Sequence, residues 1–205
     1  MQTAWMLKSL KWVIVAEIIV AVGMAGFLVA RRLRNGPAMP FDIRWTADPL
    51  PALAQPSVKV CKSKFVMTVF DGDRAVKSYR VAVGGGAGDK RKEGDRCTPE
   101  GEFYVCLKNP KSDYILSLGL SYPNEGAAAR GLRDGLIDQT THDEIVGAIR
   151  SHGCPPWKTP LGGEIMIHGC RNGRDHTLGC VAIDDDLIRE LYPLIPLGTA
   201  VTVVP

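Results

Sequence analysis

The chain has 205 residues, a length that suits one domain of ordinary size with a short appendage. Hydrophobic residues make up 45% and charged residues 23%, which is enough apolar material for a core and excludes a disordered protein. The formal net charge is only +3, and no basic stripe with interleaved aromatic residues runs through the chain, which argues against nucleic-acid binding.

The first predicted element is a transmembrane helix over residues 12–30, which follows a short segment at 1–11. This apolar run contains one charged residue, Glu17, and no proline, and it is about long enough to cross a membrane. It is longer than the apolar part of a secretory signal peptide, and no small-residue cleavage site stands next to it. We therefore expect an uncleaved single-pass anchor. The alternative is a buried soluble helix, which would be more amphipathic.

The charges that flank this helix do not decide its orientation. Lys8 and Lys11 precede it, and Arg31, Arg32 and Arg34 follow it. The positive-inside rule is therefore close to a tie, with a lean toward a cytoplasmic domain.

Residues 31–56 are expected to form a tether between the membrane and a folded domain over 57–205. Residues 35–55 of the tether have no clear periodicity and contain four prolines, Pro37, Pro40, Pro49 and Pro51. The composition then changes to β-rich runs at 58–62 and 64–70. A turn signal, Asp-Gly-Asp at 71–73, leads into a third run at 74–83, so a hairpin is predicted here.

The rest of the domain is predicted to be mainly β with a few short helices. The glycine cluster at 84–88 lacks the spacing of a phosphate-binding loop and is expected to be an ordinary loop. Helices are expected at 138–150, capped near Thr140 or Thr141, and at 184–194. Further strands are predicted at 102–107, 164–168 and 199–204.

Histidine and cysteine are concentrated in one stretch. Three of the four histidines and three of the six cysteines lie within 29 residues, as the pairs His152/Cys154, His168/Cys170 and His176/Cys180. His142 lies outside this stretch. Three interpretations compete, namely nucleophilic catalysis, a zinc site and purely structural residues.

Catalysis is favoured for Cys180 because its surroundings suit a reactive thiol. A free thiol is mostly protonated at neutral pH, and a nearby imidazole converts it to the thiolate. His168 ends a β-rich run, and Gly169 allows a tight turn after it. Gly179 leaves room for a substrate carbonyl, and the backbone N–H groups of Gly179 and Cys180 suit an oxyanion.

The other two interpretations fit the remaining residues. Two His-x-Cys pairs could bind one zinc ion, although the Cys-x-x-Cys spacing common in structural sites is absent. A structural role suits His142 and His152, which would be surface or core residues. Five cysteines are interpreted as disulfides or small buried hydrophobes whose pairing stays open: Cys61, Cys97, Cys106, Cys154 and Cys170. Of these, Cys97 and Cys106 flank a Thr-Pro-Glu-Gly turn and could face each other across a hairpin.

Several stretches together resemble the catalytic domain of the L,D-transpeptidase (YkuD-like) family, and most of all its branch related to the YafK murein proteins. The order and spacing of the stretches, rather than any single one, carry the resemblance, which extends from Val58 to Val204. The matching segments are 88–95, 98–103, 108–112, 117–124, 161–169 and 177–183.

The resemblance implies a β-sandwich-like catalytic fold and thiol acyl transfer. A thiolate on Cys180 would attack the carbonyl between the L-centre of a diamino acid and a terminal D-alanine in a peptidoglycan stem. D-alanine would leave, and an amine or water would resolve the thioester. No metal or organic cofactor is implied.

The resemblance also assigns roles to individual residues. His168 corresponds to the catalytic histidine, the Gly169 carbonyl would orient its imidazole, and Gly179 lies at the expected oxyanion site. Substrate contacts are implied for three more residues, Tyr122, Ser117 and Thr177.

The chain departs from the commoner family pattern beside the nucleophile. Leu178 replaces a histidine two residues before the cysteine, and Ala182 replaces an arginine two residues after it. A second segment, Ser-His-Gly-Cys at 151–154, matches the family signature better letter for letter. The prolines that follow Cys154 do not suit the expected strand, and His142 lies in a helical stretch, so Cys180 is preferred.

The sequence thus predicts a peptidoglycan L,D-transpeptidase in the bacterial inner membrane, with its domain on the periplasmic or extracytoplasmic side. Its expected partners are stem peptides and, through the N-terminal helix, the membrane. The alternatives are a cysteine hydrolase on the same scaffold and a zinc- or peptidoglycan-binding module. Protein partners and oligomeric state are not indicated.

Overall fold

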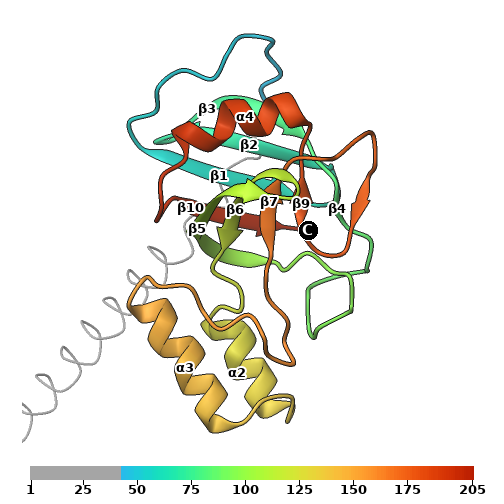
Figure 1. The fold of residues 1–205 in the computed structure, drawn as a ribbon, viewed down its shortest axis with the longest axis vertical. Helices are drawn as coiled ribbons and strands as arrows, with labels where there is room; N and C mark the ends of the chain where they lie inside the picture. Colours follow the sequence, from blue (N-terminus) through green and yellow to red (C-terminus); the bar gives the residue numbers. More distant parts are fainter. Residues whose placement is uncertain (1–42) are drawn as a thin grey trace, which may run out of the picture. The chain divides into compact units, whose positions relative to one another are not determined.

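The structure is a computed structural model that describes residues 43–205 (Figure 1). The predicted segment 1–11, the transmembrane helix over 12–30 and the first part of the tether lie outside the described residues. Within residues 43–205, none of the helices has the length and apolar character needed to span a membrane. Residues 43–55 contain no helix or strand before the first strand begins.

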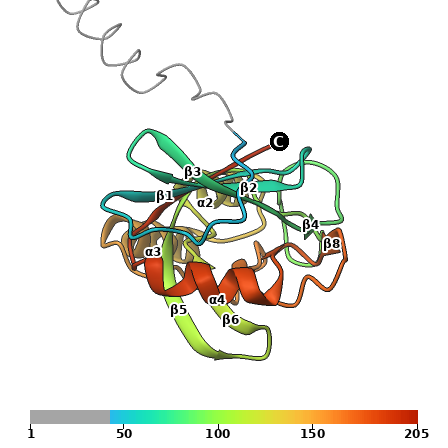
Figure 2. The same ribbon diagram turned by 90° about the horizontal axis from the view of Figure 1, so that it is seen from above.

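The domain is built on one mixed sheet of eight strands in the order β3-β2-β1-β10-β5-β6-β7-β9. The pairs β1/β10 and β7/β9 are parallel, and the other neighbours are antiparallel. The sheet curls, so that β5 and β6 run across the direction of β1–β3 (Figure 2). The strands are β1 Pro56–Cys61, β2 Val66–Asp71, β3 Arg74–Arg80, β5 Gly101–Ser112, β6 Ile115–Leu120, β7 Met166–His168, β9 Val181–Ala182 and β10 Ala200–Val204.

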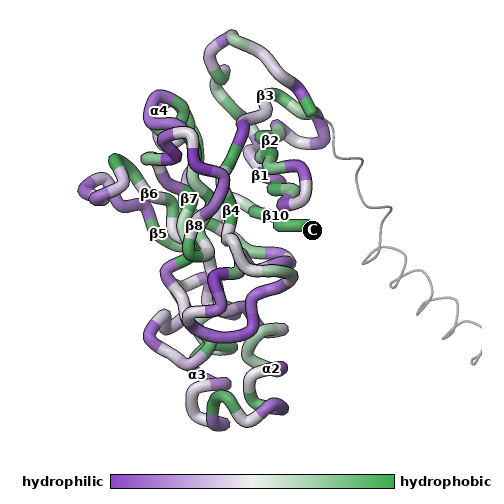
Figure 3. Tube along the Cα trace, turned by 90° about the vertical axis from the view of Figure 1, so that its right-hand side faces the viewer, coloured by the Kyte–Doolittle hydropathy of each residue, from purple (hydrophilic) through white to green (hydrophobic). Residues whose placement is uncertain are grey.

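Two short strands, β4 (Val83–Gly84) and β8 (His176–Thr177), form a separate parallel pair. The mainly β domain expected from the sequence is therefore confirmed. The expected sandwich is replaced by a single curled sheet with this small pair beside it. Figure 3 shows hydrophobic stretches along the strands, whereas the long loop between β4 and β5 is largely hydrophilic.

The predicted hairpin is confirmed as β2 and β3, joined by a tight turn. Gly72 has a φ of 57°, a left-handed conformation that glycine adopts without steric cost. β2 is buried along almost its whole length because its apolar residues pack on both sides. Val60, Val69 and Val81 are among the fully buried residues of the main core.

Three helices complete the domain: α2 Glu125–Arg133, α3 Gln139–Arg150 and α4 Asp185–Leu194. The predicted helix α4 is confirmed, and it buries Ile188 and Leu191 in the main core. Helices α2 and α3 lie at the other end of the domain (Figure 1) and share a small core of their own. Its buried members are Ala128, Ile137, Ile145 and Leu161.

One prediction about the helices needs correction, and one helix was not predicted. Helix α3 is capped by Asp138, whose side chain accepts a hydrogen bond from the Thr141 N–H, and not by Thr140 or Thr141. Helix α2 was not predicted, because its buried face consists of small residues that give little hydrophobic periodicity. β6 was likewise not predicted as a strand.

Candidate active site

The strands β7 and β9 bring the two candidate catalytic side chains to one face of the sheet. They pair in parallel, with His168 opposite Ala182, and the Ile183 N–H donates to the His168 carbonyl at 2.9 Å. Cys180 lies two residues before Ala182. Cys180 directly precedes β9, and its side chain lines the same cavity as His168.

The His168 imidazole is oriented by its own backbone neighbour. Its Nδ1 lies 2.6 Å from the Gly169 carbonyl oxygen. A carbonyl oxygen only accepts hydrogen bonds, so Nδ1 carries the proton and Nε2 is left as the basic nitrogen. Burial lowers the pKa of His168 despite the opposing contact with Gly169, which keeps the ring neutral near pH 7. The Tyr114 ring packs against it, with 4.5 Å between ring centroids.

The Cys180 thiol is half-buried at the end of the preceding loop. Its sulfur lies 3.5 Å from the Glu164 carbonyl oxygen. Burial raises its pKa, a contact with the Met166 N–H opposes this, and the nearby Glu164 carboxylate adds to the rise. The two resting side chains are therefore a thiol and a neutral imidazole.

The loop that carries Cys180 is held by Thr177. The Thr177 hydroxyl donates to the Cys180 carbonyl at 2.7 Å and accepts from the Gly179 N–H at 3.0 Å. Gly179 has a φ of 138°, and a Cβ here would meet the Cys97 carbonyl oxygen at 3.0 Å. Glycine is thus required for the loop to pass this close to the backbone of Cys97.

Two cavities meet at Cys180. The larger has a volume of about 1200 Å³ and the smaller about 340 Å³. Cys180, Leu178 and Arg96 line both, and His168 lines the smaller one. Cys180 is thus accessible from two sides. The larger cavity is also lined by Lys90, Glu93, Trp157, Lys158 and Glu164, and the smaller by Tyr114, Cys170, Arg171, Arg174 and Thr177.

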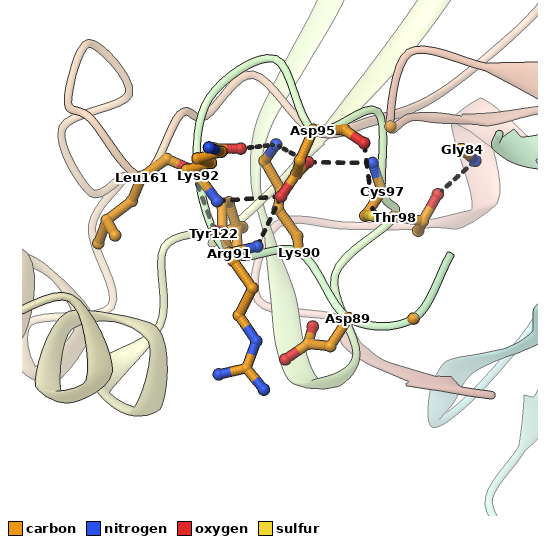
Figure 4. Close-up of polar contacts among 12 residues, drawn as sticks. Gly84, Asp89, Lys90, Arg91, Lys92, Asp95, Cys97, Thr98, Tyr122 and Leu161 are labelled. Atoms are coloured by element: carbon orange, nitrogen blue, oxygen red, sulfur yellow. Dashed lines mark hydrogen bonds and ion pairs between the residues drawn. The ribbon is translucent and has the colours of Figure 1, made fainter. Parts of the chain in front are cut away.

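One wall of the larger cavity is a loop organised around Asp95 (Figure 4). The Asp95 carboxylate accepts from the backbone N–H groups of Arg91, Lys92 and Cys97, at 2.6, 2.9 and 3.0 Å, and from Lys90 Nζ at 2.9 Å. Burial alone would raise the pKa of Asp95, but these hydrogen bonds outweigh it and lower the pKa. The carboxylate therefore fixes the loop that presents its neighbour, Arg96, to both cavities.

Two of the predicted substrate-contacting residues lie elsewhere. Tyr122 is buried in the core, where its hydroxyl donates to the Leu161 carbonyl at 3.1 Å. Ser117 is buried on β6, where its hydroxyl donates to the Ser112 hydroxyl. Neither lines the two cavities at Cys180, so their positions do not support substrate contact. Thr177 does line the smaller cavity, but its hydroxyl is engaged within the Cys180 loop.

The second signature segment does not form a comparable site. Cys154 and His152 are exposed in the turn after α3, and neither lines the cavities at Cys180. His142 lies on α3, where its Nδ1 contacts the Asp143 carboxylate at 2.8 Å. Over residues 43–205 no three side chains of His, Cys, Asp or Glu converge as metal ligands. The His-x-Cys pairs therefore do not come together as a zinc site in this part of the chain.

Sequence reasoning missed several residues at the cavities. Arg96 falls between two of the segments that carry the family resemblance, and Tyr114 lies in the turn between β5 and β6. Trp157 directly follows the two prolines after Cys154. No local pattern marks these residues, because the sheet brings them to the site from distant parts of the chain.

A model of the L,D-transpeptidase catalytic domain matches residues 55–203, which is most of the chain. A comparison with curated proteins gave no match. Among solved structures, the chain is similar to three bacterial proteins at 14–22% sequence identity and TM-scores of 0.46–0.47.

The first is an L,D-transpeptidase from Xylanimonas cellulosilytica, at 14% identity and a TM-score of 0.46, with 78% of this chain and 65% of that one covered. The second is the helical cell shape determining protein Pgp2 from Campylobacter jejuni, at 19% identity and a TM-score of 0.47, with 77% of this chain and 51% of that one covered. The third is Bd1075 from Bdellovibrio bacteriovorus, at 22% identity and a TM-score of 0.47, with 80% of this chain and 54% of that one covered. The aligned part is thus between about half and two thirds of each of these chains.

Proposed function

Because the chain belongs to the L,D-transpeptidase catalytic domain family, we propose that it is a cysteine acyltransferase acting on peptidoglycan stem peptides through Cys180. One observation carries the proposal. Cys180 and His168 line the same cavity, and the Gly169 carbonyl holds the imidazole with Nε2 as its basic nitrogen. This arrangement supplies a nucleophile and an oriented base.

In the first half of the reaction, His168 Nε2 accepts the thiol proton as the Cys180 sulfur attacks the stem-peptide carbonyl. The Cys180 N–H would stabilise the oxyanion. The Gly179 N–H would join it only after releasing its hydrogen bond to Thr177. The C–N bond to D-alanine then breaks, the imidazolium protonates the departing amine, and a thioester remains on Cys180.

In the second half, an acceptor amine attacks the thioester and His168 again accepts a proton. The sulfur leaves as the thiolate and is reprotonated. The two cavities favour transfer over hydrolysis, because each offers a separate approach to the sulfur, one for the acyl donor and one for the acceptor. Leu178 lines both cavities and is 78% exposed, so it offers an apolar contact to either substrate.

The location follows from the substrate. Assembled peptidoglycan lies outside the cytoplasm, so we propose that the domain lies on the periplasmic or extracytoplasmic face of the inner membrane, anchored by residues 12–30. The sequence resemblance to the YafK-related branch supports the same cell-wall assignment. The departures at Leu178 and Ala182 from the commoner family pattern make a related hydrolase the competing outcome.

The test is detection of a covalent acyl-enzyme by intact mass. The full-length chain, purified in detergent, is incubated with a carbapenem or a tetrapeptide stem, together with the variants Cys180→Ser and Cys154→Ser. An adduct that disappears only in Cys180→Ser supports the proposal, and one that disappears only in Cys154→Ser would overturn it.

An added amine acceptor then separates transfer from hydrolysis. A new amide product supports the transferase. Release of the free acid alone would identify the hydrolase. The absence of an adduct in all three proteins would favour a module that binds peptidoglycan without catalysis.

A further inference from the structure

The segment that follows α3 lies along β5, far from it in sequence. The Tyr104 hydroxyl donates to the Gly153 carbonyl at 2.7 Å, and the Tyr104 ring lies 5.2 Å from the His152 ring, centroid to centroid. The register of β5 against β6 is irregular between Val105 and Leu107, which leaves Cys106 as an extra residue on β5. Cys106 lies beside Cys154, one residue beyond Gly153, and both thiols act on the Tyr104 hydroxyl.

The two thiols contact each other. The Cys106 side chain is in hydrogen-bonding contact with that of Cys154, and both are free thiols in the structure. Cys106 is half-buried, whereas Cys154 is exposed. Burial raises the pKa of Cys106, and the contact with Cys154 raises it further. An oxidant would therefore meet Cys154 first.

The other cysteines are placed differently. Cys97 is buried, with its thiol 3.4 Å from the Ala87 carbonyl oxygen, so the expected meeting of Cys97 and Cys106 across a hairpin does not occur. The Cys61 thiol lies 3.3 Å from the Pro205 carbonyl oxygen. Cys170 lines the smaller cavity beside His168. None of these three lies on the face of β5 that carries Cys106.

We propose that Cys106 and Cys154 form a disulfide when the protein meets a thiol oxidant of the disulfide class. Cys154 attacks the oxidant RSSR, forms a mixed disulfide and releases one RSH. Cys106 then attacks the Cys154 sulfur, the Cys106–Cys154 bond forms, and the second RSH leaves. Two protein thiols are oxidised, and one disulfide molecule is reduced to two thiols.

The cross-link has a consequence for the active site. The chain continues from Cys154 directly into residues 157–165, which supply a wall of the larger cavity at Cys180. The disulfide would fasten the start of this wall to the central sheet and close a chain loop of 48 positions. The expectation that the protein meets an oxidising compartment rests on the proposed function. Bond formation in the test below does not depend on that function, because the oxidant is added.

The test uses the full-length chain in detergent with Cys180→Ser as the background, so that the candidate nucleophile does not exchange with the new bond. The protein is treated with oxidised glutathione, its remaining thiols are alkylated, and peptide mapping identifies any linked pair. Matched samples carry Cys106→Ser, Cys154→Ser or, as the control, Cys61→Ser. Thermal unfolding is followed with and without a reductant.

In the background protein and in the Cys61→Ser sample, we expect a mass loss of two hydrogens, two fewer alkylated cysteines and one linked peptide pair. The Cys106→Ser and Cys154→Ser samples should show none of these changes. The unfolding midpoint should rise by about 5–15 °C on oxidation and return on reduction. A cross-link that joins Cys97 or Cys170 instead would overturn the proposal. Failure of the background protein to cross-link while it remains folded would overturn it as well.

Discussion

Replacing Asp95 by alanine tests how the wall of the larger cavity is held. The carboxylate accepts from three backbone N–H groups and from the Lys90 ammonium. Lys90 and Asp95 form an ion pair whose side chains are 5% and 14% exposed, so solvent screens it little. In Asp95→Ala the Lys90 ammonium keeps its contact with the Lys92 carbonyl but loses its counter-charge.

The size of the stability loss in Asp95→Ala depends on which of the former hydrogen-bond donors to Asp95 water can reach. Arg91 and Lys92 are exposed, so their N–H groups turn to solvent at small cost. Cys97 and Lys90 are buried, and an unpaired donor and an uncompensated charge remain there. Removing one partner of a buried ion pair costs about 3–5 kcal/mol, so we expect a loss of that size in the free energy of unfolding.

Urea denaturation followed by tryptophan fluorescence measures the effect. Glu93→Ala is the matched control, because Glu93 is an exposed acid on the same loop, and it should change the stability by less than about 0.5 kcal/mol. A cost below about 1 kcal/mol for Asp95→Ala would refute the reasoning, since the carboxylate would then not organise the loop.

The pH dependence provides a second check on Asp95. Its folded-state pKa is lowered, so its contribution to stability is complete above the unfolded value of about 4. The contribution is lost as the pH falls through the folded-state pKa. The stability difference between wild type and Asp95→Ala should therefore shrink in acid and stay constant between pH 5 and pH 8.

Three further predictions concern the site and its scaffold. Acylation, measured by intact mass, should persist as the pH falls below the ordinary histidine pKa of about 6.5 and should decline only at lower pH, because burial lowers the pKa of His168. The substitution His168→Gln should slow acylation by about 10²–10⁴-fold at neutral pH. Gly163→Ala should destabilise the domain and distort the larger cavity, because its Cβ would lie 2.4 Å from atoms of Trp157. The control is Gly173→Ala, whose Cβ meets no atom within 4 Å. In urea denaturation this control should lower the free energy of unfolding only through the strain of a left-handed backbone. Glu190→Ala should cost about 3–5 kcal/mol in the same assay by leaving the Lys77 ammonium without its counter-charge, and the added substitution Lys77→Met should recover most of that loss.

The sequence predicted those elements whose signals are local. The hairpin of β2 and β3 carries β-rich runs around an Asp-Gly turn, and α4 carries an amphipathic pattern with acidic residues in its first turn. Both patterns fix an element without reference to distant parts of the chain. The roles assigned to Cys180 and His168 stay predictions, although the structure brings both to one cavity.

Elements without a local signal were missed. Helix α2 buries Ala127, Ala128 and Gly131, and a Cβ on Gly131 would meet the Leu161 side chain at 2.7 Å. The missing side chain of Gly131 lets helix α2 approach Leu161 closely. In a sequence, however, a glycine disfavours the prediction of a helix. The substrate contact expected for Tyr122 stays a prediction, because a tyrosine in a family motif suits a core or a pocket equally well and the structure buries it.

The strand order has a consequence for how the domain matures. β10 lies between β1 and β5 and joins the two halves of the main sheet, which are also bridged between Ala82 and Ala182. Residues 200–204 are synthesised after every other strand described here, so β1 and β5 each keep an unpaired edge until this segment has been made. The sheet that positions Cys180 and His168 is therefore completed by the strand that is made last among those described.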